Sequence, residues 1–423
     1  MYKKLHAKNG LTAIVSPMNQ MASVSIGIWI GVGGRYESAA QSGISHLVEH
    51  MLFKGTYMRS AKDLKEAIEG VGGSFNGFTS DEVTCYMVKV PSKYMELGLD
   101  ILADMVMNAK FDEEDLAREK FVVCEEIKMY RDQPSEHVLD VLSGIVWPDN
   151  ALGRPLTGSA GNVKGFKRQE LIAFREKNYH PGNIAVIASG KVNTEKFFAS
   201  ATEKFKDRKN GKRQPLHTPK IRQKAPRVKI CGGNSKQAHI AMGFHADCNN
   251  TKERFAVKLM NVILGGNMSS RLFEELREKY GLCYDISSSY KRHSDLGELQ
   301  IHAGVDNSKA LRSVTAILDE LKKLRDLGVT EDELARAKEY TKGQFLLAIE
   351  GTSSRMLWLG DRIMVHREIP ATKEVLDNID GVSTAEIMKA CDRIFRASSA
   401  NLAIIGKMTG GVKDKIRKEL GIL

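Results

Sequence analysis

Cysteine is scarce in this sequence, and its placement excludes two kinds of site. Six cysteines occur in 423 residues, they are scattered, and no two of them form a C-x-x-C pair (Cys85, Cys124, Cys231, Cys248, Cys283 and Cys391). This pattern argues against a disulfide framework and against a cysteine-ligated zinc site. We expect reduced thiols and a cytoplasmic protein.

Long hydrophobic runs are also missing. No stretch approaches the ~18 consecutive apolar residues of a membrane helix, and the opening MYKKLHAKNG lacks the apolar core of a signal peptide. The composition, 42% hydrophobic and 27% charged, is that of an ordinary globular protein. We therefore expect no membrane association and no secretion by the signal-peptide route.

Aromatic residues make up 7% of the chain, which bears on the net charge of +11. A nucleic-acid binder of this charge would interleave aromatic side chains with Lys and Arg on one face, and here the aromatics sit mostly in apolar strands. The basic excess is spread out except in the run 204–229, which also contains Pro215, Pro219 and Pro226. We interpret that run as a linker and expect no nucleic-acid partner.

Two segments of the sequence recur at one offset. FDEEDLAREK at 111–120 resembles VTEDELARAK at 329–338, and NIAVIASGKV at 183–192 resembles NLAIIGKM at 401–408, each 218 residues later. A period this long indicates a duplicated domain rather than a solenoid repeat. We predict domains at 1–208 and 227–423, joined by a basic linker at 209–226.

The hydrophobic pattern is similar in the two halves. Each has an alternating strand, a helix, a second strand, two long helical stretches and a closing strand; the expected strands are 23–30, 83–90 and one from 183, then 238–245, 297–305 and one from 401. This order predicts an α+β fold of two duplicated domains, each a mixed, mostly antiparallel sheet with helices packed on one face.

The segment GISHLVEHMLFKGT, residues 43–56, carries the strongest chemical signal. On a helix His46, Glu49 and His50 share one face, and two histidines one turn apart can bind the same zinc ion. A third ligand must come from elsewhere. Buried core histidines are the alternative interpretation.

The stretch FDEEDLAREKFVVCEE offers carboxylates for the third ligand. Glu119 and Glu126 are two turns apart on one helix face, whereas Glu125 is rotated by about 100° and Cys124 has no second thiol nearby. Spacing alone hardly separates Glu125 from Glu126, but the face shared with Glu119 favours Glu126.

The duplicate lacks these groups. At the 218-residue offset Glu119 corresponds to Ala337 and Glu126 to Gln344, and the second half contains no H-x-x-E-H. We therefore expect one metal site per chain, in the first domain, and not in the second.

The H-x-x-E-H order is the inverzincin signature, and the chain resembles the pitrilysin family of zinc metallopeptidases, nearest the short-subunit branch that includes mitochondrial processing peptidase. The resemblance covers nearly the whole chain. It implies Zn²⁺, one per chain, bound by His46, His50 and the glutamate 76 residues further on, which is Glu126, with Glu119 supporting the site. It also implies that Glu49 is the catalytic base.

Further matches concern the substrate. G-G-x-x-N, ending at Asn76, resembles the family's substrate-side strand, although the family usually has Ala where this chain has Gly77. Phe53 corresponds to a residue lining the pocket beside the cut bond, with core packing as the alternative. Arg277 and Tyr284 resemble a substrate pair from the half without zinc; as bare residues they would be a surface arginine and a buried tyrosine.

The resemblance implies a zinc endopeptidase that cleaves unfolded peptides or presequence-like segments inside a clamshell chamber of four domains. One chain has two domains, so two chains are needed. This chain has both the zinc residues and the Arg/Tyr pair, so a homodimer suffices; a heterodimer with a zinc-less paralogue is the alternative. A structural subunit, like the core proteins of respiratory complexes, is the rival function, but such subunits typically lose a ligand.

Overall fold

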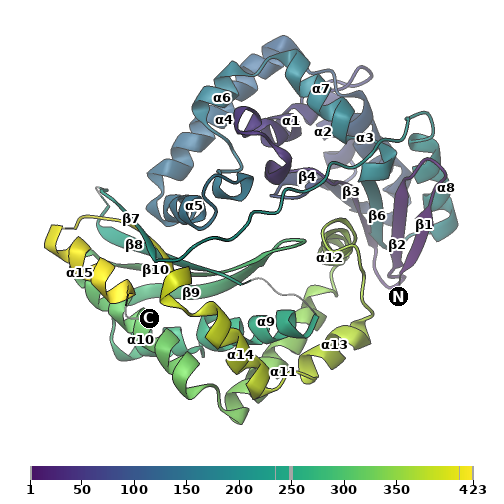
Figure 1. Ribbon diagram of the computed structural model, residues 1–423. Helices are drawn as coiled ribbons and strands as arrows, with labels where there is room; N and C mark the ends of the chain where they lie inside the picture. Colours follow the sequence, from purple (N-terminus) through teal and green to yellow (C-terminus); the bar gives the residue numbers. More distant parts are fainter. Residues whose placement is uncertain (1, 234, 247–250, 409, 422–423) are drawn as a thin grey trace. The chain divides into compact units, whose positions relative to one another are not determined.

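The computed structural model describes residues 2–233, 235–246, 251–408 and 410–421 (Figure 1). The chain forms two compact units. The first contains residues 1–128, 154–217 and 346–369, and the second contains 129–153, 218–345 and 370–423. None of the helices in the described ranges is long and apolar enough to span a lipid bilayer.

The first unit is built on a six-stranded mixed sheet. Its strand order is β1-β2-β6-β3-β5-β4, in which only β2 and β6 pair in parallel, and its strands are β1 (Lys3–His6), β2 (Thr12–Pro17), β3 (Ser23–Ile30), β4 (Ser74–Thr79), β5 (Thr84–Pro91) and β6 (Ile184–Gly190). The strand β4 forms one edge of the sheet, and its pairing partner is β5. One side of β4 is therefore open to a further strand.

Most of the helices of the first unit cover one face of this sheet, the face to which every second residue of β3 points. Val24, Ile26, Ile28 and Ile30 are buried in the main core, together with apolar residues of the helices. Those helices are α1 (Ile44–Leu52), α2 (Ala61–Glu69), α3 (Met95–Asn108), α4 (Glu113–Asp132), α6 (Ala160–Gly165), α7 (Arg168–Asn178) and α8 (Thr194–Lys204). The expected strand at 23–30 is confirmed, and so is the expected helix that carries His46, Glu49 and His50, which is α1.

A helix from the second half of the chain packs on the opposite face of this sheet. In α12 (Thr352–Met364), Met356 lies against Trp29 of β3, with the indole Nε1 3.4 Å from the sulfur. Gly360 lies against the same indole so closely that an added Cβ would be 2.0 Å from Trp29 Cε2. Glycine is required here because any side chain would hold the helix off the sheet.

The second unit has a five-stranded mixed sheet in the order β7-β11-β8-β10-β9. Its elements are β7 (Arg227–Cys231), β8 (Gln237–His245), α9 (Thr251–Gly265), a π-helical segment (Phe273–Lys279), β9 (Cys283–Arg292), β10 (Gly297–Asp306), α10 (Ala310–Leu327), α11 (Glu331–Ala348), α13 (Thr372–Asp380), α14 (Thr384–Ile394), β11 (Asn401–Ile405) and α15 (Gly410–Leu420). The two mixed sheets with their helices confirm the predicted α+β class.

The second unit likewise receives a helix from the first half. Val138, Leu142 and Val146 of α5 (Pro134–Val146) pack against Ala241 of β8 and Ala403 of β11. The two halves thus exchange one helix each. We expected helices on one face of each sheet, and the exchanged helices α12 and α5 cover the other face. The division at 1–208 and 227–423 follows the repeat along the chain, whereas the compact units contain the exchanged segments.

The segment 209–226 contains neither helix nor strand. It is nevertheless held in place at Arg213, which donates hydrogen bonds to Tyr36 and to the carbonyl of Met364. The segment is therefore not a freely solvated tether along its whole length. The cysteines of the described ranges are free thiols, and Cys248 lies outside those ranges.

Candidate metal centre

The helix α1 starts at a bidentate cap. The Glu37 carboxylate accepts hydrogen bonds from the backbone N–H groups of Gly43, at 2.8 Å, and Ser45, at 2.7 Å. Gly43 adopts a φ of +96°, which a residue with a side chain rarely does. Burial raises the pKa of Glu37 to about 6, although these N–H groups and Arg154 oppose the rise. A buried carboxylate thus fixes the first turn of the helix that carries H-x-x-E-H.

His46 and His50 of α1 meet Glu126 of α4. One potential ligand atom from each lies within 4.8 Å of the other two, and the Glu126 Oε2 atom is 3.7 Å from His46 Nε2 and 3.6 Å from His50 Nε2. Ligands about 2.0–2.1 Å from a tetrahedral zinc ion are roughly 3.3–3.4 Å from one another, so small shifts bring these atoms to a shared ion. Among the described residues this is the group that could bind a metal.

Glu119 connects the histidine pair to a cation. Its Oε2 atom is 3.0 Å from His50 Nδ1, and its Oε1 atom is 2.6 Å from Lys54 Nζ. The contact at Nδ1 leaves His50 Nε2 directed at Glu126, which is the usual arrangement of a carboxylate behind a metal-binding histidine. Lys54 was not among the predicted site residues, although its position four residues after His50 is a signal that the sequence contains.

The protonation of the histidines suits a metal. Burial, together with the neighbouring His50, lowers the pKa of His46 to about 4, so its imidazole is neutral at neutral pH. No described residue hydrogen-bonds to His46 Nδ1, although this nitrogen is buried. For His50, burial acts to lower the pKa, but the surrounding carboxylates of Glu119, Glu49 and Glu126 raise it overall. A divalent cation would take the place of that proton.

Glu49 points from α1 to the edge strand β4. Its Oε2 atom accepts a hydrogen bond from Thr79 Oγ1 at 3.2 Å, and burial raises the pKa of its carboxyl group. Its other oxygen lies beside Gly77, where an added Cβ would be 3.0 Å from Glu49 Oε1. A raised pKa and a place between the histidines and an open strand edge are what a proton-transferring carboxylate needs.

The predicted substrate residues near β4 have different environments. Phe53 packs against the rings of Phe75 and Tyr86, at centroid distances of 5.5 Å and 6.1 Å, so packing accounts for part of its role. The Phe53 ring also lies close to Gly77, since a Cβ added to that glycine would be 3.0 Å from Phe53 Cε2. Asn76 is exposed on the edge strand, and its Oδ1 atom accepts the N–H of Gly77 at 2.8 Å.

The alternatives to Glu126 lie elsewhere. Glu125 is exposed and forms an ion pair with Lys128 at 2.6 Å. Cys124 is buried among apolar side chains of the core. The shared-face argument from Glu119 therefore selected the carboxylate that the structure places beside the histidines.

Arg277 and Tyr284 lie together in the second unit. The Arg277 guanidinium carbon is 5.0 Å from the centroid of the Tyr284 ring and 4.5 Å from that of Phe273. Tyr284 is 79% exposed, so its interpretation as a buried core tyrosine is wrong. The pair forms a cation–π contact with an accessible phenol.

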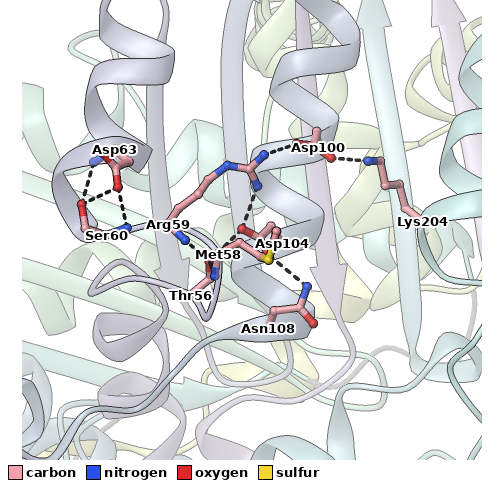
Figure 2. Close-up of polar contacts among 9 residues, drawn as sticks. All are labelled: Thr56, Met58, Arg59, Ser60, Asp63, Asp100, Asp104, Asn108 and Lys204. Atoms are coloured by element: carbon pink, nitrogen blue, oxygen red, sulfur yellow. Dashed lines mark hydrogen bonds and ion pairs between the residues drawn. The ribbon is translucent and has the colours of Figure 1, made fainter.

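A polar cluster holds the segment that follows α1 (Figure 2). Arg59 bridges Asp100 and Asp104 of α3 at 2.6 Å and 2.7 Å, and Thr56 Oγ1 donates to Asp104 at 2.8 Å. The same Thr56 oxygen accepts the N–H of Arg59 at 2.9 Å. The cluster fixes the chain just beyond Lys54, the residue whose ammonium contacts Glu119.

Two family matches cover most of the chain. Residues 13–160 match the family described as insulinase (peptidase family M16), and residues 165–340 match the peptidase M16 inactive domain. An uncharacterized zinc protease of Bacillus subtilis is 33% identical over 96% of this chain and 98% of its own length. An uncharacterized zinc protease of Streptomyces coelicolor is 34% identical over 96% and 89%.

Solved structures share the fold. A protease from Helicobacter pylori matches with a TM-score of 0.90 and 21% identity, covering 96% of this chain and 99% of that one. A chain of complex III2 from Candida albicans matches with a TM-score of 0.85 and 16% identity over 99% of both. These identities show the fold alone, but the family matches and the zinc-protease relatives go further: the chain belongs to peptidase family M16, the insulinase or pitrilysin family.

Proposed function

We propose that the chain is a zinc-dependent endopeptidase that cleaves unfolded peptides or presequence-like segments. The observation that carries the proposal is the meeting of His46, His50 and Glu126, with Glu49 turned from the same helix toward an open strand edge. The naming of the relatives as zinc proteases supports it.

The proposed chemistry assigns one role to each group. Zinc bound by His46, His50 and Glu126 would lower the pKa of a water molecule toward ~7 and polarise the scissile carbonyl. Glu49 accepts a proton from the attacking water and delivers it to the leaving amine. Glu119 holds the His50 ring by its Nδ1 atom, and Lys54 holds Glu119.

The edge strand β4 is the proposed binding site for the peptide backbone. An extended peptide can pair with its free side, which gives affinity through main-chain hydrogen bonds and little dependence on sequence. Phe53, Asn76 and Gly77 would then lie beside the bound residues. This binding mode explains why unfolded segments, rather than folded proteins, would be substrates.

The proposed assembly is a homodimer that encloses the substrate, with a zinc-less paralogue as the alternative partner. In it Arg277 and Tyr284 of one chain act at the metal site of the other, where they stabilise the oxyanion or hold the substrate carbonyl. The exposure of Tyr284 is compatible with such a role.

The direct test is Glu49→Gln. We expect the variant to bind zinc like the wild type but to lose hydrolysis of a peptide mixture, because an amide cannot accept the proton. Glu125→Gln, an exposed glutamate on α4, is the matched control and should remain active. Turnover in the Glu49→Gln protein would refute the mechanism. Absence of zinc and of any chelator-sensitive cleavage in the wild type would favour the non-catalytic subunit.

A mixing experiment tests the assembly. Arg277→Ala and Glu49→Gln chains should each be inactive alone, and a mixed dimer should recover part of the activity at the one site that has both residues. If dimers shown to be mixed recover nothing, Arg277 acts within its own chain.

A further inference from the structure

The first unit contains a cavity on the side of α4 turned away from the metal cluster. Its walls are α4, the end of α6 and the first turn of α7, and its volume is about 800 Å³. Because a helix turns about 100° per residue, Ala117 and Phe121 on the cavity wall lie on the side of α4 away from Glu119 and Glu126. This volume is in the range of small-molecule sites, roughly 300–1,000 Å³.

The inner surface of the cavity is apolar. Leu116, Cys124 and Phe166 are buried beneath it, and Ala117 and Ala160 contribute further apolar surface. Phe121 also lines it, yet its side chain is 68% exposed. An exposed aromatic ring beside an apolar hollow offers an apolar guest further surface to pack against.

The rim of the cavity is cationic. Lys120, Lys164, Lys167 and Arg168 line it, and none of the four forms an ion pair within the described part of the chain. Lys120 donates to the carbonyl of Lys164 at 3.3 Å, and Arg168 donates to the carbonyls of Phe111 and Lys110. These neutral acceptors orient the cations without cancelling their charge.

The remaining charged lining residues do not offset this excess. Glu125 is paired with Lys128 across 2.6 Å, which leaves Glu113 as the other acidic group. An apolar hollow with an uncompensated cationic rim is complementary to a molecule that has an apolar body and one acidic head. The lining residues belong to helices and to the turn between them, so no strand edge is present to bind a peptide backbone.

We propose that this cavity binds a small anionic amphiphile, a carboxylate with an apolar chain. The chain lies on Leu116, Cys124 and Phe166 under the Phe121 ring, and the carboxylate lies among Lys120, Lys164 and Lys167. The site does not depend on the proposed peptidase activity, because it uses none of the metal-cluster residues.

The test is titration calorimetry of the full-length protein with decanoate, and with decanol as the neutral analogue. We expect one decanoate per chain and at least tenfold weaker binding of decanol. Because a carboxylate also binds zinc, the titration is repeated after chelation, and decanoate binding should persist.

Two variants locate the binding site. Gly165 lines the cavity, and a Cβ added there meets no other atom within 4 Å, so Gly165→Met adds a long side chain at the cavity lining without a clash and should weaken decanoate binding; Gly343→Met, at an equally open glycine of α11, should not. Lys164→Glu with Lys167→Glu should weaken binding roughly tenfold, because each exposed charge contributes up to about fivefold.

Three results would overturn the proposal: no decanoate binding, decanol binding as tightly as decanoate, or unchanged binding in Gly165→Met. Circular dichroism verifies that each variant is folded. Should Gly165→Met fail to fold, the charge-reversed variant decides, because its changes lie at exposed lysines.

Discussion

The helices α4 and α11 occupy equivalent places in the two repeats and differ in their buried groups. They begin at Glu113 and Glu331, 218 residues apart, as the repeat predicts. Glu119 is buried on α4 between a histidine and a lysine, whereas its counterpart Ala337 is buried on α11 in an apolar setting. The helix after the first long strand differs too, since α9 contains no histidine.

The difference shows that the polar cluster around α1 is not needed to form this fold. Two histidines and four glutamates lie partly or fully buried around α1, and desolvation of such groups is unfavourable until a cation and hydrogen bonds compensate. The duplicate has the same kind of sheet and helices without that cluster. The fold therefore does not require it, and its presence in one repeat indicates a chemical role.

The largest effect is expected when Glu126 of α4 is replaced by the residue at the equivalent position of α11, which is Gln344. Glu126→Gln replaces the one carboxylate among the three proposed zinc ligands with a neutral amide. We expect the zinc affinity to fall by more than about 100-fold and peptide hydrolysis to become undetectable. Metal analysis after dialysis measures the first effect. The reciprocal Gln344→Glu should create no metal site, because α9 has no histidine to join it. Zinc retained by Glu126→Gln would contradict the ligand set.

A smaller loss of zinc affinity is expected from changes at Glu119 and Lys54, which support the ligands. Glu119→Ala, which copies Ala337, should weaken zinc binding roughly 10–100-fold, because His50 loses the carboxylate at Nδ1. Lys54→Met should weaken it less, about threefold to tenfold, and Lys54→Arg should restore it by keeping the cation beside Glu119. Competition with a chelator gives the affinities. Equal affinity in Lys54→Met and wild type would show that the lysine does not orient Glu119.

The repeats should respond to pH in opposite directions. In the first unit the pKa of Glu37 is raised by burial to about 6, so the folded state binds this proton more tightly than the unfolded chain. Its contribution to the unfolding free energy therefore rises by about 2 kcal/mol as the pH falls from above 6 to below 4.5. Urea unfolding of the metal-free protein should show this rise relative to Glu37→Gln. Parallel profiles of the two proteins would contradict it.

In the second unit the Arg271 guanidinium, which hydrogen-bonds to Glu333, lowers the pKa of that carboxyl to about 2. The stabilisation is complete above the ordinary pKa of 4.5 and is lost as the pH falls toward 2. Glu333→Gln should remove this acid-side loss and leave the rise between pH 6 and 4.5 unchanged. The two variants thus separate the acid response of each unit.

A further effect concerns the strand edge. In Gly77→Ala the new Cβ would lie 3.0 Å from Glu49 Oε1 and from the Phe53 ring, so we expect kcat/KM to fall about tenfold with the zinc content unchanged. Gly304→Ala on β10 is the control, because its Cβ would meet His239 at an ordinary 3.5 Å. Wild-type activity in Gly77→Ala would show that Glu49 and Phe53 yield to a methyl group.

Much of the fold and of the site was predictable because it depends on residues that are close together in the sequence. The alternation at 23–30 predicted a strand, and the spacing of His46, Glu49 and His50 predicted a shared helical face. The helix face shared with Glu119 indicated Glu126 as the third member of the group. Periodicity and short-range spacing determine these features.

The exchange of α5 and α12 was not predictable in this way. Both helices have apolar faces, but periodicity does not say which of two sheets such a face will meet. The contact between Gly360 and Trp29 joins residues more than 300 positions apart, and no local pattern records it. The spacing of Lys54 from His50 is a local pattern, but its partner Glu119 is on another helix, and that pairing is not recorded in the spacing.

The exchanged helices also set the order in which the protein can be completed during synthesis. The sheet of the first unit is translated by residue 190, but the helix that covers Trp29 ends at Met364. At about 5–20 residues per second the ribosome needs roughly 10–30 s more before that helix emerges. During this interval the face around Trp29 lacks its apolar cover, so a nascent chain truncated before α12 should be a target for chaperones, and separately expressed halves should fold only when they are made together.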